Sequence, residues 1–277
     1  MRHMTSLFSQ GFGALANTHF PSPIQNLINK GYVTLMGLDM SEFREPTSYD
    51  TLNALFTRHL ETPREYSKDA KDFISPCDSF ITECGRIHEN IAMQIKGMHY
   101  DVNGFLGDKI NDENKKRLEN GEYINCYLSP KDYHRFHIPC DLTVRKAVHI
   151  PGKLYPVNIP YLNKQPNLFI ENERVVIECL LENGKKFYMV LVGALNVGVM
   201  QVAFEPAIKT NASSTEVSVY TYEEGIKLSK NDDLGCFEMG STIIILAEPE
   251  TLERTINQGD KISYAQTIAR FNAKTKV

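Results

Sequence analysis

The chain has 277 residues, of which 42% are hydrophobic and 23% are charged, so it is long enough to bury one large core. Its formal net charge of −4 leaves no basic excess to neutralise phosphates, which argues against a general nucleic-acid-binding protein. The six cysteines include no C-x-x-C pair, so they indicate neither a disulfide framework nor a zinc ribbon and favour a reducing compartment.

The N-terminal segment, residues 1–38, contains no Asp or Glu. Apolar residues recur on one side of two helical stretches that prolines separate: Leu7, Phe8, Phe12 and Leu15 before Pro21, and Ile24, Leu27, Ile28, Tyr32 and Leu35 after Pro23. We therefore expect two short amphipathic helices. Their apolar faces either cap the core or lie on a membrane surface, where the absence of acidic side chains suits anionic lipids. Residues 1–20 lack the continuous apolar core of a secretory signal.

The next segment, residues 39–70, is predicted to be helical and polar, with Asp50 or Thr51 as an N-cap and Pro63 as its end. From Phe73 onward short apolar runs alternate with turn residues, which predicts a mainly β body. The expected strands are 73–76, 79–82, 92–97, 123–128, 142–149, 174–181, 187–192, 197–204, 216–222 and 242–247. The charged stretch 112–122 is expected to form a surface helix or loop.

One apolar stretch, residues 187–204, approaches the length of a membrane span. It contains Gly193, Asn196 and Gly198 and is rich in valine, so two buried strands joined near Leu195 and Asn196 fit better than one spanning helix. The predicted fold is therefore α+β, with a mainly antiparallel, barrel-like or sandwich-like catalytic body and N-terminal amphipathic helices.

The densest polar cluster, residues 128–139, contains His134 and His137 with prolines on both sides. The two imidazoles could bind a metal ion, but the spacing indicates no third ligand, and we predict no metal site. They could divide acid and base work, since imidazole titrates near neutral pH, or they could be hydrogen-bonded structural residues.

Two further groups are candidates for chemistry. Asp78 follows Pro76 in a predicted turn and gains interest only if it orients a histidine. Gly240 and Ser241 form a corner that leads into an apolar strand, which is either a tight turn or the place of a nucleophilic hydroxyl. Spacing along the chain does not tell whether Asp78, His137 and Ser241 meet.

Taken together, several blocks resemble the phosphatidylserine decarboxylase family, which is pyruvoyl-dependent and self-processing. The blocks follow the family's order over most of the chain: residues 52–58, 94–97, 127–140, 156–158, 167–174, 192–198 and 238–242. Two positions depart from the family pattern. Met239 stands where leucine is usual, which conserves volume, and Ser79 stands where glycine is usual after the aspartate, which affects only the local turn.

The resemblance implies a mechanism and roles for four residues. His137, oriented by Asp78, takes the proton from Ser241, whose oxygen attacks the carbonyl of Gly240. Elimination and hydrolysis then cut the chain and leave a pyruvoyl group, the covalent cofactor, at position 241. In the mature enzyme this group forms a Schiff base with phosphatidylserine, carbon dioxide leaves, and phosphatidylethanolamine is released. His134 is implied to serve the decarboxylation and protonation step.

The resemblance also implies an organisation and a setting. Residues 1–40 would be a membrane-facing helical segment, and residues 41–277 a catalytic domain that cleaves itself into a β chain (1–240) and an α chain (241–277). These chains would form an α/β heterodimer, and pairing of two heterodimers stays open. We expect a peripheral protein on the cytoplasmic face of a bacterial membrane, with phosphatidylserine in that membrane as its partner. Charge alone nominates Lys96, Lys131 and Arg135 for the head-group phosphate.

Three other interpretations remain to be compared. A pyruvoyl-dependent decarboxylase could act on another amino acid-bearing substrate. A serine hydrolase could use Asp78, His137 and Ser241, although no Gly-x-Ser-x-Gly elbow surrounds Ser241. A binding scaffold without chemistry could use turns such as residues 231–235 and 259–262, which resemble those of small carrier modules. The last two predict an uncut chain.

Overall fold

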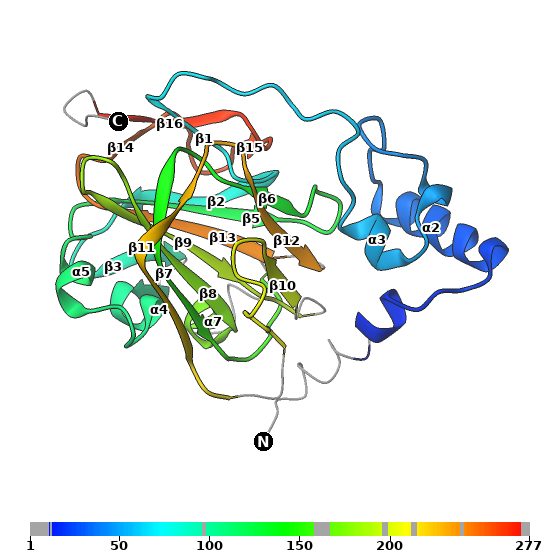
Figure 1. Cartoon of the computed structure of the whole chain (residues 1–277), viewed down its shortest axis with the longest axis horizontal. Helices are drawn as coiled ribbons and strands as arrows, with labels where there is room; N and C mark the ends of the chain where they lie inside the picture. Colours follow the sequence, from blue (N-terminus) through cyan, green and yellow to red (C-terminus); the bar gives the residue numbers. More distant parts are fainter. Residues whose placement is uncertain are drawn as a thin grey trace.

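The computed structural model describes residues 11, 13–95, 98–157, 167–195, 199–211, 215–238 and 241–272. Its centre is an eight-stranded antiparallel sheet with the order β11-β7-β8-β9-β13-β5-β2-β15 (Figure 1). These strands are β2 (Ser79–Arg86), β5 (Glu122–Leu128), β7 (Leu142–Ile150), β8 (Arg174–Leu180), β9 (Lys186–Val192), β11 (Ser218–Leu228), β13 (Ser241–Ala247) and β15 (Lys261–Ile262). The sheet is open at β11 and β15. This confirms the antiparallel α+β body and selects the sandwich-like form over a closed barrel.

Smaller sheets and short helices complete the body. One three-stranded sheet has the order β1-β16-β14, a second has the order β10-β12-β6, and β3 pairs with β4. Their bounds are β1 (Asp72–Ile74), β3 (Ile91–Ile95), β4 (Met98–Asp101), β6 (Arg135–His137), β10 (Val199–Val202), β12 (Asp233–Glu238), β14 (Leu252–Arg254) and β16 (Thr267–Phe271). The helices of the body are α4 (Val102–Leu106), α5 (Asp112–Lys116) and α7 (Leu168–Glu171).

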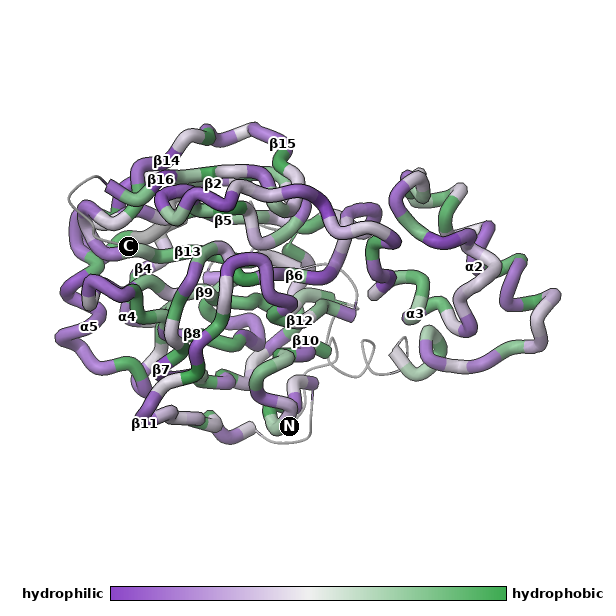
Figure 2. The backbone as a smooth tube through the Cα atoms, turned by 45° about the horizontal axis from the view of Figure 1, so that its top comes forward, coloured by the Kyte–Doolittle hydropathy of each residue, from purple (hydrophilic) through white to green (hydrophobic). Residues whose placement is uncertain are grey.

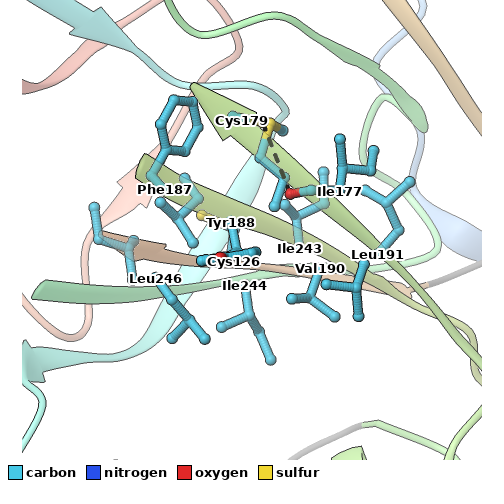
Figure 3. Close-up of a cluster of buried hydrophobic side chains, with 14 of the residues drawn as sticks. Cys126, Ile177, Cys179, Phe187, Tyr188, Val190, Leu191, Ile243, Ile244 and Leu246 are labelled. Carbon is cyan, nitrogen blue, oxygen red and sulfur yellow. Dashed lines mark hydrogen bonds between the residues drawn. The ribbon is translucent and has the colours of Figure 1, made fainter. Parts of the chain in front are cut away.

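Strand β13 lies inside the large sheet and is paired on both sides. Ile244 faces Asn125 of β5 and Val190 of β9, and all seven residues of β13 are buried. Figure 3 shows Ile243 and Ile244 packed among side chains of the neighbouring strands. A run of β-branched residues fits this position, because both faces of the pleated strand are covered.

Most of the expected strands are confirmed to within a few residues. The expected strands 123–128, 174–181 and 242–247 correspond to β5, β8 and β13. In the apolar stretch 187–204, β9 ends at Val192 and β10 begins at Val199. The stretch therefore forms two strands and not one membrane-spanning helix, as expected. Among the described residues, no helix combines the length and the apolar character needed to cross a bilayer.

The prediction that residues 39–70 are mainly helical is wrong. This segment contains only the 3-10 turn η1 (Pro46–Ser48) and the short helix α3 (Leu52–Phe56), which begins with the expected N-cap at Thr51. The remainder consists of turns and irregular chain, in which Phe43 packs in a small cluster with Tyr133 and Tyr264. Prolines interrupt helical hydrogen bonding, and this packing replaces what a continuous helix would contribute.

The helix α2 (Ser22–Met36) is confirmed, and it lies with α3 to one side of the sheets (Figure 1). Figure 2 shows hydrophobic segments alternating with hydrophilic ones along this part of the chain. The earlier expected helix falls largely outside the described residues, because residues 1–10 and 12 are among those not described.

A helix that caps a core buries its apolar side, whereas α2 buries polar residues and exposes apolar ones. Its buried residues are Gln25 and Asn29, whereas Leu27 is 74% exposed and Leu35 is 80% exposed. The Asn29 side-chain amide donates to the carbonyls of Pro46 (3.0 Å) and Tyr49 (2.9 Å). Hydrogen bonds therefore attach the polar side of α2 to the protein and leave its apolar side in solvent.

We predict that Asn29→Ala loosens α2 without disturbing the large sheet. The substitution leaves the two carbonyls of Pro46 and Tyr49 without their shared donor, which costs about 1–3 kcal/mol. Hydrogen exchange should show the free energy of local opening of α2 reduced by this amount. Asn26→Ala on the same helix is the control, and equal effects of the two substitutions would contradict the prediction.

Candidate active site

Ser241 is the first residue of β13, directly after the chain passes from β12 into the large sheet. It pairs with Leu128 of β5 and is 0% exposed. Its hydroxyl Oγ has no hydrogen-bond partner within the described ranges of the chain. A buried hydroxyl without a partner is costly, and a position where the hydroxyl takes part in chemistry is one place where such a cost is tolerated. Gly240, the predicted cleavage partner, lies outside the described residues.

His134 is held directly beside the strand that pairs with Ser241. Its Nε2 lies 2.9 Å from the carbonyl of Ser129, the residue after Leu128. Because a carbonyl only accepts, Nε2 carries the hydrogen, and Nδ1 of the neutral ring keeps a free lone pair. This Nδ1 is buried and has no hydrogen-bond partner among the described residues. Burial, helped by the nearby Arg58 cation, lowers the pKa of His134 to about 3, so the ring is neutral.

His137 lies in a different environment, three residues farther along the chain. Its Nδ1 donates to the carbonyl of Asn231 (3.3 Å), and its Nε2 accepts from the hydroxyl of Tyr133 (3.2 Å). The ring stacks on Tyr264 with the ring centroids 4.0 Å apart. Burial lowers the pKa of His137 to about 4, which keeps this imidazole neutral as well.

Asp78 is bound by a cation and by a backbone amide. Its carboxylate accepts from Nη1 of Arg64 at 2.5 Å and from the backbone N–H of Tyr264 at 2.7 Å. Arg64 also forms an ion pair with Glu42, and the hydrogen bonds that the guanidinium donates to Glu42 and Asp78 raise its pKa. The residues predicted to orient one another are therefore linked through a third one: Tyr264 contacts both Asp78 and His137.

The three sequence-predicted triad residues are not joined by direct hydrogen bonds among the described residues. Strand β12 shows which histidine lies nearer to Ser241. The backbone N–H of Phe237 donates to the carbonyl of His134, whereas Asp233, at the start of β12, pairs with His137. Since the chain continues from β12 to Ser241, His134 lies at the Ser241 end of this strand.

Sequence reasoning missed several residues of this region. Phe56 stacks on His134 with ring centroids 4.1 Å apart, and Arg58 lies close enough to lower the pKa of that histidine. Phe56 and Arg58 belong to residues 52–58, one of the blocks that resemble the family. The resemblance identified this segment but assigned no role to either residue. Tyr264 is remote in sequence, and no local signal indicated it.

The residues nominated for the phosphate are placed as follows. Arg135 forms an ion pair with Asp233. Lys131 has an exposed side chain, and its carbonyl accepts from Arg58. Lys96 lies outside the described residues. The described residues contain no group of three or more His, Cys, Asp or Glu side chains that could hold a metal ion.

Comparison with known proteins identifies the family of this chain. The family model described as phosphatidylserine decarboxylase matches residues 52–270. A phosphatidylserine decarboxylase proenzyme of Helicobacter pylori is 42% identical over 270 residues, which cover 98% of both chains. The proenzyme of Campylobacter jejuni is 42% identical over 94% of this chain and 97% of its own length. That of Marinobacter nauticus is 33% identical over 95% and 92%. The chain therefore belongs to the phosphatidylserine decarboxylase family, whose enzymes are pyruvoyl-dependent and cleave themselves.

Proposed function

We propose that this protein decarboxylates phosphatidylserine to phosphatidylethanolamine with a pyruvoyl group that it makes from Ser241. The observation that carries the proposal is the buried, unpartnered hydroxyl of Ser241 beside the His134 loop, in a chain that matches proenzymes over its full length.

In the self-cleavage, Ser241 Oγ attacks the carbonyl carbon of Gly240, and the peptide bond becomes an ester. Elimination then removes the Cα proton of residue 241 and breaks its Cβ–Oγ bond, so that the carboxylate of Gly240 leaves with the first chain and dehydroalanine remains at position 241. The dehydroalanine tautomerises to an imine, and water hydrolyses this imine to the pyruvoyl ketone and ammonia.

The residues around Ser241 suit a covalently attached ketone. When present, the pyruvoyl group supplies an electron sink for the loss of carbon dioxide from the bound amino acid. His134 offers the free lone pair of Nδ1, so it can take up a proton there and deliver it to the substrate carbon after carbon dioxide leaves. Water is excluded from this position, since His134 and Ser241 are both fully buried.

We assign the self-cleavage to Asp78, His137 and Ser241, as the family resemblance implies. A neutral His137 can act as a base, and the ion pair with Arg64 keeps Asp78 in place. The contact of both residues with Tyr264 supports a common unit. No described contact joins His137 to Ser241. The assignment therefore requires His137 to move toward Ser241.

The two cleaved chains are proposed to stay together as an α/β heterodimer. The α chain begins with β13, which pairs with β5 and β9 of the β chain on its two sides. Breaking the peptide bond before Ser241 leaves these ladders and the buried apolar faces intact. The fragments therefore need no covalent link to remain associated.

Phosphatidylserine in a membrane is the substrate that best fits the exposed apolar face of α2. Leu15, Ile24, Leu27, Leu35 and Met36 are exposed large hydrophobic residues in this part of the chain. Residues of this kind on a surface helix favour insertion into the lipid interface. We place this face on the cytoplasmic side of a bacterial membrane, since all six cysteines are free, as expected in a reducing compartment.

The first prediction concerns self-cleavage. Intact-mass measurement under denaturing conditions should find two chains in the wild type, divided between Gly240 and Ser241, with the smaller chain gaining mass on borohydride reduction. Ser241→Ala should remain one chain of 31.5 kDa, because it lacks the attacking oxygen. Ser263→Ala is the matched control and should be cut. An uncut wild type that reacts with a serine-directed phosphonate would favour the hydrolase instead.

The second prediction separates the two histidines. His137→Gln should accumulate as an uncut chain. His134→Gln should be cut but should turn over phosphatidylserine at least about 100-fold more slowly, the usual effect of losing a proton-transfer group. Mass spectrometry and release of carbon dioxide measure the two steps separately. The opposite pattern, with His134→Gln uncut and His137→Gln cut, would reverse the assigned roles.

The third prediction concerns the membrane. The double substitution Leu27→Ser with Leu35→Ser should weaken binding to vesicles of anionic phospholipid at least tenfold, since a fully buried leucine contributes about 1.5–3 kcal/mol. Sedimentation with the vesicles measures this binding. The control is Val217→Ser with Val219→Ser, which removes exposed apolar side chains on and beside β11. Equal binding of the two double variants would exclude α2 as the membrane contact.

A further inference from the structure

The short helix α3 brings an aromatic ring against a proposed catalytic histidine. Phe56 and His134 stack with ring centroids 4.1 Å apart and an interplanar angle of 27°, and both side chains are 0% exposed. The two residues come from segments far apart in the sequence. Figure 1 shows α3 on the side of the body where β6 and β12 lie. This stack is the most direct contact between the helical part of the chain and the site.

Two further contacts attach the helices to the loop that carries His134. The Tyr32 hydroxyl of α2 donates to the carbonyl of Pro130 (3.2 Å), and Nη2 of Arg58 donates to the carbonyl of Lys131 (3.3 Å). Tyr32 also contacts Phe56 edge to face, with ring centroids 6.4 Å apart. Tyr32 of α2 and Arg58, which follows α3, therefore bind the loop at two successive residues before His134.

We propose that Phe56 is a positioning residue that holds the imidazole of His134 so that Nδ1 faces the reacting centre, which makes α3 a wall of the active site. This inference rests on the proposed function, because it assigns a role to His134 in the reaction. The hydrogen bond to Ser129 restrains Nε2, but it leaves the ring free to turn about that contact. A flat ring in face-to-face contact restrains this remaining rotation.

Loss of this restraint on the His134 ring is expected to lower the rate of decarboxylation strongly. Catalysis depends on the placement of the reacting groups, and a displacement of about 1 Å can cost about 100-fold in rate. Phe56 also excludes water from one face of His134. Among the described residues, the imidazole is held by its hydrogen bond to the Ser129 carbonyl and by its stack on Phe56.

The test compares Phe56→Leu with Phe187→Leu. Both substitutions shorten a fully buried phenylalanine, but Phe187 pairs with Ala247 at the end of β13 opposite Ser241. We expect both variants to cleave themselves and to bind vesicles as the wild type does. On short-chain phosphatidylserine dispersed in detergent, Phe56→Leu should lower kcat at least tenfold with KM within about twofold, and Phe187→Leu should change neither by more than about twofold.

A spectroscopic measurement reports the position of His134 without using activity. With ¹⁵N-labelled histidine, and the His134 signals identified from their absence in His134→Gln, the wild type should show one tautomer with the hydrogen on Nε2. In Phe56→Leu this signature should broaden or shift toward a mixture of tautomers. If Phe56→Leu does not fold, Phe56→Met, which conserves volume without a flat ring, takes its place.

The outcomes are distinguishable. Wild-type kcat in Phe56→Leu, or an unchanged tautomer signature, would overturn the positioning role. Equal losses in Phe56→Leu and Phe187→Leu would also overturn it and assign the effect to general loss of packing. Absence of decarboxylation in the wild type would reject the proposed function, and the tautomer signature would then still report whether Phe56 orients His134.

Discussion

The double-sided pairing of β13 is the constraint on which the rest of the structure depends. Its ladders to β5 and β9 bury every side chain of the strand, including Ser241 at its start. The backbone of the strand cannot move without breaking ladder hydrogen bonds, and Ser241 itself is paired with Leu128 of β5. A reactive hydroxyl placed at the end of such a strand is held still, is kept from water, and remains attached to the body when the preceding peptide bond is cut.

Burial has a second effect, because it determines the chemical state of both histidines. An imidazole that loses water strongly favours its neutral form, and a carbonyl acceptor then selects which nitrogen carries the hydrogen. The Ser129 carbonyl leaves Nδ1 of His134 free, whereas the Asn231 carbonyl leaves Nε2 of His137 free to accept from Tyr133. Two histidines of the same motif are thus prepared as different proton acceptors by their different neighbours.

The N-terminal helices combine two functions in one small unit. The polar side of α2 is attached to the protein through Asn29, and its apolar side is left exposed. The same unit reaches the site through Phe56 and Arg58. On the proposal that a lipid surface receives the exposed leucines, this surface lies next to the part of the chain that contacts His134.

The sequence by itself determined most strands of the large sheet, because a strand buried on both faces requires a local run of β-branched and aromatic residues, as in 242–247. It also narrowed the N-cap of α3 to Asp50 or Thr51, and it determined the family and the identity of Ser241 and the two histidines as candidates, since these depend on residue type and order. Only the tertiary structure decided that 39–70 is mostly irregular, that α2 buries Asn29 instead of its leucines, and that Asp78 binds Arg64. It also decided that His134 lies on the Ser241 side of His137. These features depend on contacts between segments remote in the chain, and spacing along a sequence carries no measure of distance in space.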